Sequence, residues 1–150
     1  LSKILNTDYI GQRGLVDSIK NEIDFVTKAG MHNVVLSVEG NSYELSTQKE
    51  LILFRIFQEA LNNSLKHSNA NEIKIKVCFL PNGMSLAVED NGSGFVLSDK
   101  IETRNENTGI GLISMNKRAA LIGAVFSIET NENGTKVSID LPISMRENKY

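Results

Sequence analysis

The sequence predicts an α+β fold, a two-layer α/β sandwich in which helices cover one face of a mixed, mostly antiparallel sheet. Three observations predict it. Apolar residues recur at helical spacing in three segments, they alternate with other residues in five short segments, and glycine-containing turns join some of these short segments in pairs. The chain has 150 residues, of which 41% are hydrophobic, so we expect one domain over residues 1–150 with a continuous core.

Composition and charge exclude several classes of function. There are 16 Lys and Arg against 18 Asp and Glu, so the chain lacks a basic nucleic-acid-binding arm and we expect no nucleic-acid partner. No apolar run approaches the roughly 20 residues of a membrane span, and no signal peptide opens the sequence. We therefore expect a cytoplasmic domain without direct membrane contact. The single cysteine, Cys78, excludes an internal disulfide framework and a Cys-rich zinc site.

The first half of the chain predicts helix, strand and long helix. Residues 10–29 have the apolar spacing of an amphipathic helix, which ends at Gly30. In residues 34–38, apolar side chains alternate with small or polar ones, as in a strand. The long helix then runs to about residue 67. Ser46 or Thr47 is placed to cap it, with Glu50 as the acid of a capping box.

The second half predicts two hairpins separated by one helix. The strands are expected at residues 73–79, 86–88, 125–128 and 137–141, with turns at residues 81–83 and 133–134. The helix covers residues 112–122 and ends at Gly123. Residues 91–108 have neither helical nor strand period, and a loop of this length is usually functional or disordered.

The long helix carries a polar stripe. At about 100° per residue, its members fall within an arc of roughly 100°. They are Arg55, Glu59, Asn62, Asn63 and Lys66. A solvated stripe is one interpretation, but asparagine is a mediocre helix former. The alternative is phosphoryl chemistry, in which the Asn63 amide binds Mg²⁺, Lys66 neutralises phosphate charge and Glu59 accepts a proton or orients the attacking group.

Two glycine-containing segments extend this hypothesis. Residues 90–94 read D-N-G-S-G after a strand, and the Asp90 carboxylate can accept a hydrogen bond from an exocyclic amine such as that of adenine. Residues 108–112 read T-G-I-G-L and open a helix, whose free N–H groups favour phosphate. Each segment alone is equally consistent with an ordinary turn. The Rossmann, P-loop and H-E-x-x-H patterns are absent from the sequence.

In combination, these motifs resemble the GHKL ATPase superfamily, and within it the ATP-binding catalytic domain of two-component sensor histidine kinases of the nitrate- and lipid-fluidity-sensor subfamily. Residues 54–67, F-R-I-F-Q-E-A-L-N-N-S-L-K-H, are similar to its N box, and residues 88–95 to its G1 box. Residues 108–112 with Met115 and Arg118 are similar to its G2 box.

The resemblance implies a Bergerat-type fold that binds ATP and Mg²⁺. It assigns Mg²⁺ to Asn63, the phosphates to Lys66 and His67, and the adenine amine to Asp90, which Thr135 would support through a water. The resemblance also implies that the glycine segments allow the nucleotide to approach the backbone closely, and that residues 96–107 form a movable lid over it. The nucleotide-binding residues of these segments would be Gly92, Gly94, Thr108, Gly109, Gly111 and Leu112. Glu59 occupies the position of a water-activating carboxylate in related ATPases, although an acid beside the phosphoacceptor histidine is the other candidate for the base.

The implied reaction transfers the ATP γ-phosphoryl group to a histidine on a dimerisation and phosphoacceptor domain of the same full-length protein, for relay to a response regulator. That domain is not in this sequence, since His32 and His67 lack the adjacent acid that a phosphoacceptor has. Residues 1–11 are then the end of a linker or helix from it, in a membrane-anchored bacterial protein. Two alternatives stay open: a serine kinase of the anti-sigma type, and a non-catalytic nucleotide-sensing module.

Overall fold

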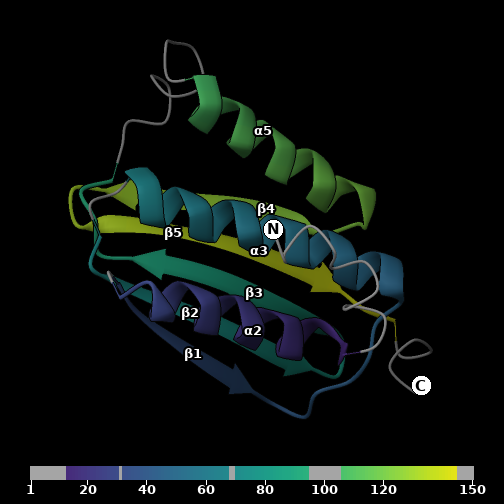
Figure 1. The fold of residues 1–150 in the computed structure, drawn as a ribbon. Helices are drawn as coiled ribbons and strands as arrows, with labels where there is room; N and C mark the ends of the chain where they lie inside the picture. The colour runs from purple at the N-terminus through teal and green to yellow at the C-terminus, as the bar shows by residue number, and fades with distance from the viewer. Residues whose placement is uncertain (1–12, 31, 68–69, 95–105, 145–150) are drawn as a thin grey trace.

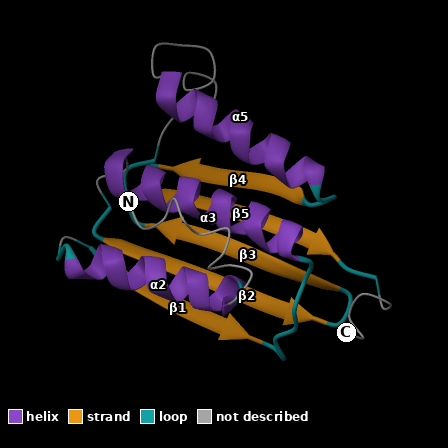
Figure 2. Ribbon diagram, turned by 45° about the vertical axis from the view of Figure 1, so that its right-hand side comes forward, coloured by secondary structure: helices purple, strands orange, loops and turns teal. Residues whose placement is uncertain are grey.

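The computed structural model describes residues 13–30, 32–67, 70–94 and 106–144. In this part of the chain, three helices lie on one face of a five-stranded sheet (Figures 1 and 2). The helices are α2 (Leu15–Lys28), α3 (Thr47–His67) and α5 (Glu106–Leu121). The strands are β1 (Asn33–Glu39), β2 (Glu72–Leu80), β3 (Gly83–Asp90), β4 (Val125–Asn131) and β5 (Gly134–Pro142). The predicted α+β sandwich is confirmed.

The sheet has the strand order β1-β2-β3-β5-β4. β1 and β2 are parallel, because α3 crosses over between them, and the other neighbouring strands are antiparallel. The mixed, mostly antiparallel sheet that the sequence predicts is therefore present. The two hairpin turns are tighter than expected, since Leu80 pairs with Gly83 and Asn131 with Gly134. Both glycines thus begin the returning strand instead of lying inside the turn.

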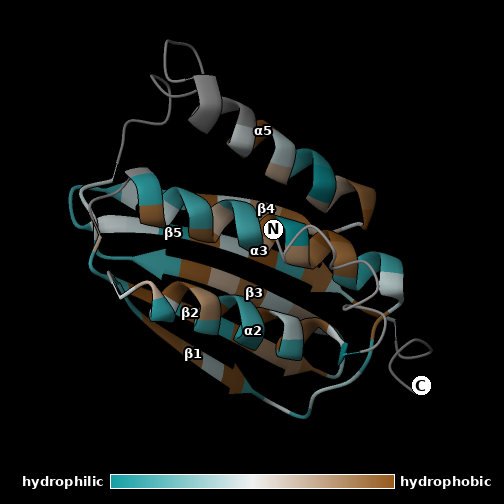
Figure 3. Cartoon of the chain, viewed as in Figure 1, coloured by the Kyte–Doolittle hydropathy of each residue, from teal (hydrophilic) through white to brown (hydrophobic). Residues whose placement is uncertain are grey.

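Alternation along the central strands builds the core. Every second side chain of β2, β3 and β5 is buried on the side that the helices cover. Figure 3 shows hydrophobic residues recurring along these strands and along the helices. The alternation continues to the strand ends, where Asp90 on β3 and Thr135 on β5 are buried although they are polar. The pleat therefore directs these two side chains toward the helices.

The central helix α3 begins as the sequence predicts, with one difference in its cap. The Ser46 hydroxyl accepts the N–H of Lys49 at 3.2 Å, so Ser46 is the capping residue. Glu50 lies one position too late for a capping box on Ser46, and its carboxylate instead accepts the N–H of Leu45 at 3.2 Å. The expected capping box is therefore absent: Ser46 caps the helix alone, and Glu50 binds the backbone of Leu45, before the cap.

The helix α5 begins earlier than the sequence predicts. It starts at Glu106, so Gly109 and Gly111 lie within its first two turns and not in a turn before it. A glycine costs only about 1 kcal/mol in a helix, which is too little to prevent the first turn from forming around it. The predicted end is confirmed. Gly123 has φ of 75°, and the N–H of Ala124 bonds the carbonyl of Ala119 at 2.9 Å, which closes a Schellman motif.

None of the helices in the described ranges combines the length and the apolar character that crossing a membrane requires.

Candidate functional site

A buried carboxylate lies where the central strands end beneath α3. Asp90, the last residue of β3, is only 6% exposed and receives three hydrogen bonds. Its Oδ1 accepts the N–H of Gly92 at 2.9 Å and that of Thr135 at 3.3 Å, and its Oδ2 accepts the hydroxyl of Ser64 at 2.7 Å. A carboxylate has about four acceptor positions. One position on Oδ2 therefore remains for a further donor, as the amine of a purine would require.

Thr135 supports Asp90 more directly than the sequence predicts. Its backbone N–H is the donor to Asp90, because the two residues are register partners in the β3–β5 ladder. Its hydroxyl lies 2.8 Å from the hydroxyl of Thr130 on β4. The side chain thus ties the two strands of the hairpin together, while the main chain holds the carboxylate. A role of Thr135 through a bound water stays a prediction.

Sequence reasoning gave no role to Ser64, which the structure places at this site. Its side chain is 5% exposed and joins α3 to the end of β3 through Asp90. The available signal was a polar residue on an otherwise apolar helix face, next to Asn63. A buried hydroxyl has to find a partner, but nothing in the sequence says which one.

The residues proposed for the phosphates follow on the same helix. Asn63 is half-buried and Lys66 is exposed, both on α3. His67 is the last residue of the helix, and its side chain lies outside the described part. Asn63 is the immediate neighbour of Ser64 in the chain, so the structure brings it to the same end of α3 as the contact with Asp90. An amide oxygen is a suitable ligand for Mg²⁺.

Glu59 lies against a glycine of the neighbouring helix. It is half-buried on α3, one turn before Asn63. A Cβ on Gly111 of α5 would overlap Oε2 of Glu59 and would lie 3.1 Å from its Cδ. The missing side chain of Gly111 therefore lets α5 approach α3 at the level of this carboxylate. In the sequence, Glu59 and Gly111 belong to separate motifs. In the folded chain they are neighbours where α5 packs against α3.

The other glycine-segment residues occupy distinct positions. Gly94 has φ of 72°, and a Cβ there would overlap the carbonyl oxygen of Asn131, so the backbone of the D-x-G-x-G segment packs on the β4–β5 hairpin. Thr108 and Gly109 lie in the first turn of α5, with side-chain environments outside the described part, and Leu112 is a buried core residue. The expected lid at residues 96–107 lies outside the described residues, except for its last two positions, which begin α5.

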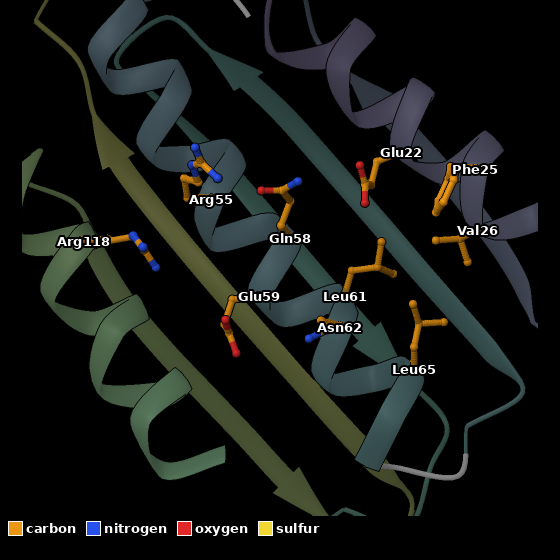
Figure 4. Close-up of a pocket in the computed structure, with 10 residues that line it drawn as sticks. All are labelled: Glu22, Phe25, Val26, Arg55, Gln58, Glu59, Leu61, Asn62, Leu65 and Arg118. Atoms are coloured by element: carbon orange, nitrogen blue, oxygen red, sulfur yellow. The ribbon is translucent and has the colours of Figure 1, made fainter. Parts of the chain in front are cut away.

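A pocket continues from Glu59 along the helices. It has a volume of about 330 Å³ and is lined by residues of α2, α3 and α5 (Figure 4). Of the predicted polar stripe, Arg55, Glu59 and Asn62 line this pocket. The lining also includes Gln58 and Arg118, for which the sequence suggested no chemistry. Part of the stripe is thus a pocket wall, whereas Asn63 and Lys66 are not among the lining residues.

Comparisons with known proteins show the family to which the chain belongs. A family profile described as histidine kinase-, DNA gyrase B- and HSP90-like ATPase matches residues 48–145. The histidine-protein kinase/phosphatase DegS of Bacillus subtilis is 36% identical over 71% of this chain and 28% of its own length. The sensor protein VraS of Staphylococcus epidermidis is 31% identical over 91% of this chain and 37% of its own length. The chain thus spans about a third of the length of these curated relatives.

The fold is found in solved histidine kinases. The histidine kinase domain of a blue-light activated kinase from Erythrobacter litoralis has a TM-score of 0.69 and 19% sequence identity, covering 94% of this chain and 62% of that one. At this identity the similarity is one of fold. Since the family profile covers well over half of the chain, membership follows from the sequence match itself. The chain therefore belongs to the family of histidine kinase-, DNA gyrase B- and HSP90-like ATPases, as an ATP-binding catalytic domain of the histidine kinase type.

Proposed function

We propose that this domain binds ATP with Mg²⁺ and transfers the γ-phosphoryl group to a histidine on a dimerisation and phosphoacceptor domain of the same full-length protein, from which a response regulator receives it. The observation that carries the proposal is the buried Asp90 carboxylate, which three donors hold in place and which keeps one acceptor position. An adenine amine supplies the donor that this position lacks.

The residues along α3 suit the triphosphate end of the nucleotide. Asn63 would hold Mg²⁺ through its amide oxygen, and the metal would neutralise charge on the phosphate oxygens. Lys66, exposed on the same helix, adds a compact positive charge, and His67 follows it. The first-turn N–H groups of α5, which include those of Thr108 and Gly109, have no partner within the helix and face outward along the helix dipole.

Glu59 has the position of a general base or an orienting group. Its carboxylate is half-buried beside Gly111, at the level where α5 contacts α3. From there it can orient the acceptor imidazole or accept its proton, provided that the acceptor approaches through the pocket that Glu59 lines. Because phosphoryl transfer has a loose transition state, the contribution of these residues is mainly positioning and charge stabilisation.

Calorimetric titration of the domain with ATP, in the presence of Mg²⁺, tests the first half of the proposal. Asp90→Ala should abolish nucleotide binding, whereas Asp140→Ala, at an exposed position of β5, should leave it unchanged. Near-native ATP affinity of the Asp90 variant would contradict the assignment of the adenine site. Failure of the unmodified domain to bind ATP in the presence of Mg²⁺ would contradict the proposal.

The phosphorylated product tests the second half. The full-length protein should form an acid-labile, base-stable phosphohistidine when it is incubated with ATP and Mg²⁺. An acid-stable phosphoserine on a partner protein would contradict the proposal and favour the serine kinase of the anti-sigma type.

A further inference from the structure

Asn91, the second residue of the D-N-G-S-G segment, has no part in the proposed function, yet its side chain makes three hydrogen bonds. Its Oδ1 accepts the main-chain N–H of Asn71 and that of Glu72, each at 3.1 Å. Its Nδ2 donates to Oδ1 of Asn71 at 2.9 Å. Both asparagines are exposed, so these bonds attach the segment to the start of β2 from outside the hydrophobic core.

The main chain strengthens the same attachment. The N–H of Asn91 donates to the carbonyl of Glu72 at 3.2 Å, one residue beyond the last pair of the β2–β3 ladder. The carbonyl of Asn71 in turn accepts the N–H of Asn33, at the start of β1, at 3.0 Å. The position of Asn91 is therefore fixed by two neighbouring strands and not only by its own turn.

On its other side, the segment lies against the β4–β5 hairpin. A Cβ on Gly134 would overlap the carbonyl oxygen of Asp90 and would lie 3.3 Å from Cα of Asn91. A Cβ on Gly94 would overlap the carbonyl oxygen of Asn131. The segment is thus held between the hairpin and β2, and Asn91 supplies the side-chain hydrogen bonds on the β2 side.

The peptide group that follows Asn91 carries a donor to the buried carboxylate. The N–H of Gly92, a buried residue, donates to Oδ1 of Asp90 at 2.9 Å. Because a peptide group is planar, the direction of this N–H depends on the backbone angles of Asn91 and Gly92. Glycine restricts these angles least of all residues. The bonds of Asn91 to β2 therefore supply the restraint that the glycine lacks.

We propose that Asn91 is a positioning residue for recognition of the purine base. By attaching the segment to β2, it fixes the peptide group that presents the Gly92 N–H to Asp90, and so sets the direction of the acceptor position that remains on Oδ2. Asn91 acts through Gly92 and Asp90 and not through contact with the base. The inference rests on the proposed function, in which this acceptor position binds the adenine amine.

Amide hydrogen exchange, followed by NMR on the nucleotide-free domain, tests the attachment itself. In Asn91→Ala, exchange of the Gly92 N–H should accelerate by roughly tenfold or more, while that of Val137, in the middle of β5, changes by less than about twofold. Asn33→Ala, at an exposed position of the same end of the sheet, is the matched control and should change neither rate. Unchanged exchange at Gly92 in the Asn91 variant would refute the inference.

Calorimetry tests the consequence for base recognition, with Mg²⁺-ATP and with purine riboside triphosphate, which lacks the exocyclic amine. The wild-type domain should bind ATP roughly tenfold or more tightly than the amine-free nucleotide, because a hydrogen bond to a carboxylate is lost. Asn91→Ala should reduce this preference to less than about threefold. Asn91→Asp should recover most of it, since it keeps the oxygen that accepts the two main-chain N–H groups.

The outcomes separate this inference from the proposed function. Equal losses of affinity for both nucleotides in Asn91→Ala, with the preference kept, are the result of a merely structural role and would refute the inference while the adenine site at Asp90 stands. A wild-type domain that binds neither nucleotide, or both equally, would contradict the adenine site itself. Thermal unfolding shows whether each variant is folded. If Asn91→Ala is not, Asn71→Ala, which removes only the bond between the two side chains, should show the same changes to a smaller extent.

Discussion

The hydroxyl of Ser64 on α3 donates a hydrogen bond of 2.7 Å to Oδ2 of Asp90 at the end of β3. This contact fastens the helix that carries Asn63 and Glu59 to the strand that carries the proposed adenine-binding carboxylate. Both side chains are buried, at 5% and 6% exposure. The position of α3 relative to the end of β3 therefore depends on Ser64, a residue to which neither metal binding nor adenine binding is assigned.

Removing this hydroxyl should cost stability. Ser64→Ala leaves the buried Asp90 carboxylate with two donors in place of three, and a hydrogen bond to a charged group is worth about 1.5–3 kcal/mol. We expect the free energy of unfolding, measured by urea denaturation, to fall by that amount. Ser127→Ala, at an exposed position of β4, is the control and should change it by less than about 0.5 kcal/mol. Equal effects of both substitutions would show that the contact contributes nothing.

Gly111 and Glu59 should be energetically coupled. Alanine in a helix is about 1 kcal/mol more favourable than glycine, but a Cβ at residue 111 would overlap the Glu59 carboxylate. Gly111→Ala should therefore stabilise the domain by about 1 kcal/mol in a Glu59→Ala background, and by clearly less, or not at all, with Glu59 present. A double-mutant cycle of unfolding free energies measures the difference. Additive effects would contradict the contact.

Alanine substitutions at Gly94 and Gly123 distinguish the cost of backbone strain from the cost of steric overlap. Their φ values are 72° and 75°, so alanine is similarly strained at both positions, by about 1–2 kcal/mol. A Cβ at residue 94 would overlap the carbonyl oxygen of Asn131, whereas one at residue 123 has no atom within 4 Å. Gly94→Ala should thus lower the melting temperature much more than Gly123→Ala does. Similar losses in the two variants would mean that the segment after Asp90 is free to move away from the hairpin.

Asn63 should control the dependence of nucleotide binding on metal. With Asn63→Ala, the calorimetric ATP affinity should no longer rise when Mg²⁺ is added, because the amide ligand is missing. Asn21→Ala, exposed on α2, is the control and should keep the normal Mg²⁺ dependence. An unchanged Mg²⁺ titration in the Asn63 variant would contradict the assignment and mean that other residues hold the metal.

Glu50 should make stability depend on pH. Burial raises the pKa of its carboxyl above the ordinary value of 4.5, the nearby Glu44 raises it further, and the N–H groups of Leu45 and Leu15 lower it in part. A raised folded-state pKa gives stability that is fully present below pH 4.5 and is lost as the pH rises through the folded-state pKa. Glu50→Gln keeps an acceptor for Leu45 but cannot ionise, so the stability of this variant relative to wild type should increase over that range. A difference that is constant with pH would contradict the prediction.

Much of the architecture was predictable because it depends on local patterns. Alternation in the segment from Ile73 to Phe79 and helical spacing in α3 each follow from one face being buried. The start of α5 was not predictable in this way, since Gly109 and Gly111 suggested a turn. Ser46 caps α3 as predicted, but the capping-box role of Glu50 was wrong, because its carboxylate accepts the N–H of Leu45 in the folded chain.

The sequence by itself determined the elements, the order of the motifs and the side chains that carry the proposed chemistry, since these depend on residue types at short range. Only the tertiary structure decided which of them meet. Ser64 and Asp90 are 26 positions apart, and Asp90 and Thr135 are 45 apart. Arg55 and Arg118 share a pocket only because α3 and α5 pack on the same face of the sheet. Such pairs form when segments that are distant in the chain pack together to bury apolar surface. Because this packing decides which polar groups meet, a local sequence pattern cannot specify the partner of each one.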